Sequence, residues 1–126
     1  MFLLDTHIVL WWLMEPEKLS RSEYEAIENA QHFCYISAAS IWEMAIKSSL
    51  NKLTLPPDLQ RHLMANDFKV LPIDFDIAMR VKEMPYHHHD PFDRLIIATA
   101  QHHHLTVITH DAEFEKYELD RAGDVT

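Results

Sequence analysis

The stretch Asp90-Pro-Phe-Asp-Arg-Leu-Ile-Ile-Ala-Thr-Ala100, followed by Leu105-Thr-Val-Ile-Thr109, decides the fold. Proline is favoured in the first turn of a helix, and Asp90 is a suitable N-cap before it. The side chains predicted to face a core recur at helical spacing: Leu95, Ile96, Thr99 and Ala100. The apolar run 105–109 does not alternate with polar residues, which is typical of a strand covered on both faces. A helix that leads into a buried strand is therefore predicted.

Earlier parts of the chain repeat this alternation of strand and helix. Three similar apolar runs are Phe2–Leu4, Phe33–Ile36 and Val70–Ile73. Helix starts between them are indicated by the capping box Ser20-Arg-Ser-Glu23, by Pro56-Pro-Asp58, and by Asp74 or Asp76. Strands separated by helices pair in parallel through crossover connections. We expect a three-layer α/β/α sandwich with a short parallel sheet, formed as a single domain by residues 1–126.

Composition excludes several classes of function. The net charge of −9 by itself argues against a nucleic-acid partner, because affinity for phosphates comes mainly from Lys and Arg. The single glycine, Gly123, excludes glycine-rich phosphate loops and dinucleotide fingerprints. No apolar run is long enough for a bilayer, and residues 1–5 lack the features of a signal peptide. With Cys34 interpreted as a buried thiol, we expect a cytoplasmic protein without membrane association.

Acidic residues occupy corresponding places in this pattern. Asp5 follows the first predicted strand and Asp111 follows the last. Glu43 lies about two turns into the helix after the second strand, with Ser37 as the expected cap, and Asp93 lies in the first turn of the helix before the last strand. Ligands of open parallel sheets bind beyond the carboxyl ends of the strands. We therefore expect these carboxylates to meet at one edge of the sheet.

Such a cluster indicates a divalent cation. Neighbouring carboxylates raise one another's pKa, and a cation removes that penalty. Oxygen ligands favour Mg²⁺ or Mn²⁺ over zinc, and Mg²⁺ binds substrate phosphate oxygens readily. The ion would polarise a phosphodiester and activate a water, and it would supply positive charge that the chain lacks. Metal-dependent phosphodiester hydrolysis is the predicted chemistry.

Each acidic residue also has a structural interpretation. Asp5 is equally well placed to cap a helix that begins near His7. Glu43 stands three residues after Ser40 and would complete a capping box, although its neighbours are apolar. Asp93 would complement a helix dipole, and Asp111 would be an ordinary turn residue. Their shared location, rather than any one of them, carries the functional interpretation.

Four blocks of the sequence resemble the PIN-domain family, and most of all the VapC-type toxins of bacterial type II toxin–antitoxin modules. They occur in order: Leu3–His7, Ile36–Lys47, His89–Ala100 and Val107–Asp111. The resemblance implies a Mg²⁺- or Mn²⁺-dependent endoribonuclease that forms a homodimer and is inhibited by a cognate antitoxin. RNA rather than DNA as the substrate follows from the family alone.

The resemblance also implies roles for individual residues. The four acidic positions of the family fall on Asp5, Glu43, Asp93 and Asp111. Asp90 matches an additional acid that supports the site, although we favour the N-cap interpretation for it, and Thr6 matches a small hydroxyl residue. Lys47 and Arg94 match basic positions. Lys47, one turn beyond Glu43, is expected either to orient that carboxylate or meet a phosphate, or to form a surface ion pair of small effect.

The histidine content departs from the family pattern. His87–His89 and His102–His104 flank the Asp93 helix, while His7 and His110 adjoin two proposed ligands. Adjacent histidines do not converge on one ion, so the triplets are interpreted as solvated, and His7 and His110 as neighbours of the site.

Two rival functions remain at this stage. One is a phosphatase-like hydrolase with Asp5 as nucleophile, which usually needs a second Asp where this chain has His7. The other is a catalytically silent PIN-like module that acts through protein contacts, for which the apolar stretch Trp11–Leu13 offers a surface.

Overall fold

The computed structural model describes residues 1–30, 33–86, 90–112 and 114. The elements follow in the order β1 (Phe2–Leu4), α1 (Thr6–Met14), α2 (Arg21–Ala30), β2 (Cys34–Ser37), α3 (Ala38–Ser49), α4 (Leu59–Ala65), β3 (Lys69–Leu71), α5 (Phe75–Arg80), α6 (Pro91–His103) and β4 (Thr106–Ile108). Short 3₁₀ turns cover Pro16–Lys18 and Val81–Glu83.

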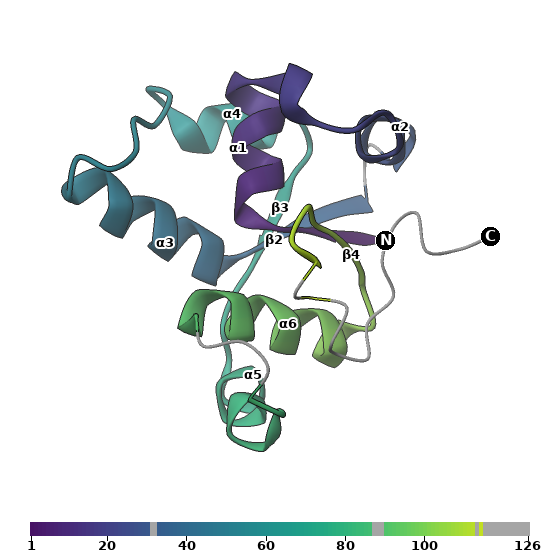
Figure 1. The fold of residues 1–126 in the computed structure, drawn as a ribbon, viewed down its shortest axis with the longest axis vertical. Coiled ribbons are helices and arrows are strands. Elements are labelled where there is room, and N and C mark those ends of the chain that lie inside the picture. Colours follow the sequence, from purple (N-terminus) through teal and green to yellow (C-terminus); the bar gives the residue numbers. More distant parts are fainter. Residues whose placement is uncertain (31–32, 87–89, 113, 115–126) are drawn as a thin grey trace.

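The four strands form one parallel sheet in the order β3-β2-β1-β4. Leu3 in β1 is paired with Tyr35 of β2 on one side and with Val107 of β4 on the other. Helices lie on both sides of the sheet, with α1, α2 and α4 on one side and α5 and α6 on the other (Figure 1). The predicted three-layer sandwich with a short parallel sheet is confirmed.

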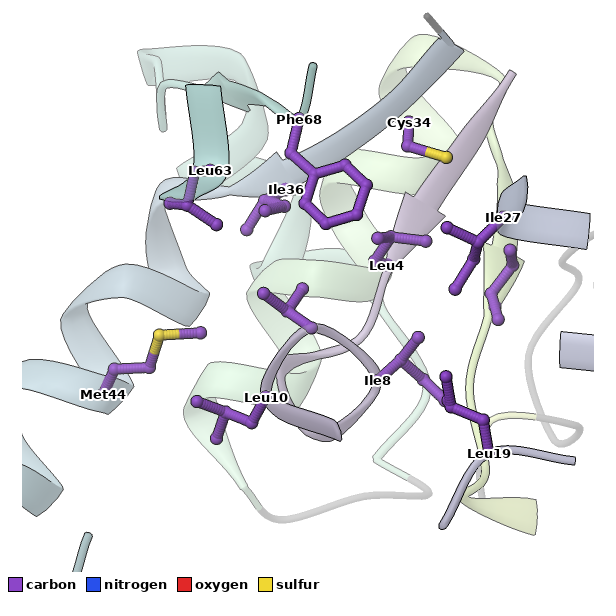
Figure 2. Packing of buried hydrophobic residues seen from close by; sticks show 12 residues of the cluster. Leu4, Ile8, Leu10, Leu19, Ile27, Cys34, Ile36, Met44, Leu63 and Phe68 are labelled. Carbon is purple, nitrogen blue, oxygen red and sulfur yellow. The ribbon is translucent and has the colours of Figure 1, made fainter. Parts of the chain in front are cut away.

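Alternation along the strands divides the core between the two faces of the sheet. Successive side chains of a strand point to opposite faces, so Leu3 packs with Ile77 of α5 and Ile96 of α6. Leu4, the next residue, packs with Ile8 of α1 in the second core cluster, where Cys34 is a buried free thiol (Figure 2). Each face of the central strands is thus covered by apolar side chains.

The strand bounds differ slightly from those expected, and one expectation about burial was wrong. β1 has the predicted bounds, whereas the other strands are shifted or shortened by one or two residues. β3 lies at the edge of the sheet and pairs only with β2, and its Val70 is 45% exposed. An apolar run therefore identified the strand but did not reveal that it would be open to solvent on one side.

The predicted helix starts are largely confirmed. Ser20 and Glu23 form a reciprocal capping box, with N···O distances of 2.8 and 3.1 Å. Asp74, not Asp76, caps α5 by accepting a hydrogen bond from the Ile77 N–H. α4 begins after Asp58, whose backbone is left-handed and whose side chain makes no capping bond. Among the described residues, no helix is long and apolar enough to cross a membrane.

The strand order fixes where a ligand site is expected. The chain adds β2 and then β3 on one side of β1, and afterwards places β4 on the other side. This reversal makes the crevice between β1 and β4 the topological switch point, where open α/β sheets bind ligands beyond their carboxyl ends. Asp5 and Asp111 both follow strands that border this crevice.

Candidate functional site

Asp5 lies directly at the carboxyl end of β1 and is 4% exposed. Its backbone N–H donates to the Ile108 carbonyl of β4 at 3.0 Å. Its Oδ1 accepts from the Thr6 N–H at 2.7 Å, and its Oδ2 accepts from the Thr109 hydroxyl at 2.9 Å. Asp5 therefore is the helix cap that the sequence allowed, and it is also held in the β1–β4 crevice.

Thr109 connects the ends of the two strands. Its hydroxyl donates to Asp5 Oδ2 and accepts from the Asp111 N–H at 3.0 Å, and the residue is 7% exposed. One side chain thus fixes both the carboxylate after β1 and the backbone that carries the carboxylate after β4. Sequence reasoning did not identify Thr109 as a site residue, although the Thr-x-Asp spacing was the available signal.

Glu43 reaches the crevice from α3. This helix is capped by Ser37, as expected, so the alternative of a capping box between Ser40 and Glu43 is wrong. Ser40 is instead buried inside the helix, where its hydroxyl accepts from Thr6 Oγ1 at 2.9 Å. Glu43 is 3% exposed, and its Oε2 accepts from Lys47 Nζ at 2.8 Å.

The second carboxylate oxygen of Glu43 is unpaired. Within the described part of the chain, Oε1 is buried and has no hydrogen-bond partner. Leaving a charged oxygen buried without a partner is costly, typically by more than the 1–3 kcal/mol of a neutral group. An oxygen in this state is suited to a cation or a water held beside it.

The start of α6 brings two more acids to the same place. Asp90 is its N-cap, with Oδ1 accepting from the Phe92 N–H at 2.8 Å, which confirms the capping interpretation. Burial, and after it the negative charges of neighbouring acids, raise the pKa of the Asp93 carboxyl to about 8; those acids are Asp5, Asp90, Glu43 and Asp111. Asp93 therefore lies among all the acids predicted for the site.

The pKa of the Asp5 carboxyl is raised as well. Burial raises its pKa, while the hydrogen bonds from Thr109 and Thr6 and the charge of His7 lower it, and the charge of Glu43 raises it again. A buried carboxyl group surrounded by others favours the protonated form unless positive charge is supplied.

Lys47 is a nearby source of positive charge. Its pKa is raised first by the hydrogen bond to Glu43 and also by the charges of Glu43, Asp90 and Asp93. The Lys47 side chain is 40% exposed while that of Glu43 is 4% exposed, so the pair is partly buried. Lys47 thus orients Glu43 and also faces the start of α6.

Arg94 turns to a different environment. It is 6% exposed, and its guanidinium donates to the carbonyls of Val81 at 2.9 Å and Pro85 at 3.1 Å. It also lies over the ring of Tyr86, 4.6 Å from the centroid. Although Arg94 was expected to support the site, these contacts fasten the segment 81–86 to α6.

The histidines that the sequence singles out lie in different environments. His110 Nδ1 lies 3.0 Å from Glu23 Oε2, and its ring forms a T-shaped pair with that of Trp11, with centroids 5.4 Å apart. His7 is exposed near Asp5, with its ring 6.0 Å from that of Trp11. The triplet 102–104 ends α6, far along the helix from Asp93, and residues 87–89 lie outside the described chain.

The donor set fits a hard divalent cation. Asp5, Glu43, Asp93 and Asp111 offer only oxygen atoms, and one buried oxygen of Glu43 has no partner in the described structure. Across residues 1–30, 33–86, 90–112 and 114, no three His, Cys, Asp or Glu side chains are arranged so that they could hold an ion directly. Mg²⁺ does not require that, because it usually keeps several waters and binds one or two carboxylates. The acids therefore suit a hydrated ion.

Comparison with known proteins agrees with this fold. The PIN-domain family model matches residues 2–119. Ribonuclease VapC22 from Mycobacterium tuberculosis is 30% identical over 122 residues, which cover 94% of this chain and 93% of that protein. A toxin–antitoxin complex from Klebsiella pneumoniae is 26% identical with a TM-score of 0.65, covering 94% of this chain and 93% of its own. FitAcB from Neisseria gonorrhoeae, 22% identical with 96% of each chain covered and a TM-score of 0.70, shares the fold. The chain belongs to the PIN-domain family.

Proposed function

We propose that this chain is a metal-dependent endoribonuclease that acts as the toxin of a toxin–antitoxin pair. The observation that carries the proposal is the convergence of carboxylates around Asp93 at the β1–β4 switch point, where its pKa is raised to about 8. Carboxylates without matching bases at a ligand-binding edge are best explained by a cation that completes the site.

The choice of substrate and partner rests on the relatives. VapC22 is named a ribonuclease, and the Klebsiella pneumoniae structure is a toxin–antitoxin complex. By analogy we infer an RNA substrate, a cognate antitoxin that blocks activity, a homodimer and a cytoplasmic location. The carboxylates themselves treat RNA and DNA backbones alike.

Asp5, Glu43, Asp93 and Asp111 would hold Mg²⁺ or Mn²⁺. When bound, the ion would supply Lewis-acid chemistry to the phosphodiester and would make a water more acidic. The chain itself keeps the acids in place: Thr109 fixes Asp5 and the Asp111 backbone. Burial of Asp5 and Glu43 excludes bulk water, which strengthens the electrostatic interactions in the crevice.

Three further residues support this arrangement. Thr6 is buried and ties α1 to α3 through its hydroxyl bond to Ser40. Asp90 starts α6 so that Asp93 falls in the first turn. Lys47 orients Glu43 and remains partly exposed, which suits it to meet a substrate phosphate.

The function is tested with purified protein freed of any partner. We expect cleavage of single-stranded RNA with Mg²⁺ or Mn²⁺ and no cleavage after EDTA, with recovery when the metal is returned. A silent interaction module would cut nothing under either condition, and a phosphatase would release phosphate from monoesters without cutting the chain. Either result would overturn the proposal.

Thr109→Val is expected to lower the cleavage rate by about ten- to a hundredfold, the usual effect of removing a group that orients metal ligands. Valine keeps the shape of threonine but removes the hydroxyl that bonds to Asp5 Oδ2 and to the Asp111 N–H. Initial cleavage rates measure the effect, and thermal unfolding shows that the fold persists.

Thr106→Val is the matched control, since it makes the same chemical change at the other end of β4. Thr109→Ser restores a hydroxyl and should recover most of the rate. If Thr109→Val cleaves RNA as fast as Thr106→Val, Thr109 does not position the site.

A further inference from the structure

A small pocket lies between α1 and α3, next to the acidic cluster. Its volume is about 220 Å³. The lining residues that matter here are Thr6, His7, Trp11, Met44, Lys47 and Lys52. The pocket is smaller than the roughly 300–1,000 Å³ of sites for drug-sized ligands. It has room for one flat ring system and not for the face of a helix.

The pocket shares a wall with the proposed active site. Thr6 directly follows Asp5, and Lys47 is the residue that pairs with Glu43. On the other side Trp11 contacts the ring of His110, the neighbour of Asp111. A ligand in the pocket is therefore adjacent to the place where a phosphodiester would be cut.

Trp11 offers an aromatic surface that the fold does not fully use. It is partly exposed, and its indole N–H has no acceptor in the described structure. Trp12 provides a contrast, since its Nε1 donates to Asn66 at 3.0 Å and its ring packs on Tyr24 and Phe68. Trp12 is thus bonded within the fold, whereas Trp11, which also contacts the rings of His7 and His110, lines the pocket with an indole N–H that has no acceptor among the described residues.

Positive charge lies at the same pocket. Lys52 is exposed and has no carboxylate partner among the described residues, whereas Lys47 is paired with Glu43. The one acid of the lining, Glu15, is neutralised by Lys18 at 2.9 Å. In a chain of net charge −9, an unpaired lysine beside an aromatic pocket suits a phosphate attached to a flat ring.

We propose that this pocket binds one unpaired base of the RNA substrate, stacked on Trp11, with Lys52 on the adjoining phosphate. The proposal rests on the proposed function, because it names the state of the RNA that the site accepts. A base inside a duplex cannot enter such a pocket without leaving its stack, so the substrate is single-stranded at the cut. Aromatic stacking and one cation are the usual means of binding such strands.

The test measures binding, not cleavage. Asp93→Asn protein in EDTA is titrated into a fluorescent, short single-stranded RNA, and anisotropy is followed at several salt concentrations. Trp11→Leu in this background should weaken binding by about tenfold, within the range for loss of one base–aromatic stack, while Trp11→Phe should retain most of the affinity. Lys52→Ala should reduce the slope of log affinity against log salt by about 0.7, the value for one single-strand phosphate contact.

Lys82→Ala is the matched control, because it removes the same charge from an exposed position in the 3₁₀ turn Val81–Glu83. It should leave the salt slope unchanged. Equal affinities for Trp11→Leu and the parent, or equal binding of a duplex of the same sequence, would overturn the base pocket. Failure of the proposed function is distinguishable, since it would appear as no metal-dependent cleavage by the wild-type chain whatever the binding results.

Discussion

Asp93→Asn is expected to reduce the cleavage of single-stranded RNA by about a thousandfold or more, with the fold retained. Asparagine keeps the size of the side chain but removes its negative charge. Asp93 lies among Asp5, Asp90, Glu43 and Asp111, so it is central to the charge that would hold a cation. A thousandfold lower rate corresponds to a loss of about 4 kcal/mol of transition-state stabilisation, since each tenfold change is worth about 1.4 kcal/mol. Initial rates at saturating Mg²⁺ measure the effect.

Asp58→Asn is the matched control for this substitution. Asp58 is exposed, makes no capping bond and has a left-handed backbone that asparagine tolerates. It should cut at the wild-type rate. Asp5→Asn should behave like Asp93→Asn, because Asp5 is buried at the same edge of the sheet. If both cluster variants cut as fast as Asp58→Asn, the acidic-cluster mechanism is wrong.

The alternation of strands and helices was readable because both faces of a parallel sheet are covered. Leu3 and Leu4 are both fully buried, one in each core, and a run of such residues identifies a central strand. The order of the strands was not readable. β3 is at the edge because the next strand, β4, is added on the opposite side of β1. An apolar residue such as Val70 does not reveal this change in the order of the strands.

The position of the acids followed from the same logic. Asp5 and Asp111 each come just after a strand, and the two strands are neighbours in the sheet, so their placement at the same edge was predictable. The cap of α3 had two candidates, Ser37 and Ser40, and only the end of β2 at Ser37 decides between them. With Ser37 as the N-cap, Glu43 lies about two turns into α3 and is not part of a capping box.

Residues whose role depends on a tertiary partner were the ones that the sequence left undecided. An arginine in the first turn of a helix looks the same whether it meets solvent or buried carbonyls, and Arg94 meets the carbonyls of Val81 and Pro85. Thr109 acquires its role from Asp5, which is 104 positions away in the chain. Local patterns carry no record of such pairings.

The stability of the metal-free protein is expected to fall as the pH rises from about 4 to about 8. The pKa of Asp93 is raised from 3.8 to about 8, and that of Asp5 is also raised, so the folded state binds protons more tightly than the unfolded chain. An acid with a raised pKa stabilises the fold below its unfolded pKa, and this contribution is lost as the pH passes through the folded value. Thermal unfolding in EDTA across this range measures the decline, and Asp93→Asn should make it shallower.

Mg²⁺ should reverse the decline at pH 8, because a bound cation favours the ionised carboxylates that destabilise the free protein. At about a hundredfold excess over its dissociation constant the ion adds roughly 2.7 kcal/mol, or about 10 °C in Tm for a chain of this size. Asp58→Asn should show the same rise as the wild type, while Asp93→Asn should show little. A wild-type Tm at pH 8 that does not respond to Mg²⁺ or Mn²⁺ would mean that the clustered acids hold no ion. The negative charge of the cluster would then be compensated by another group, and Lys47 is the cation already in contact with Glu43.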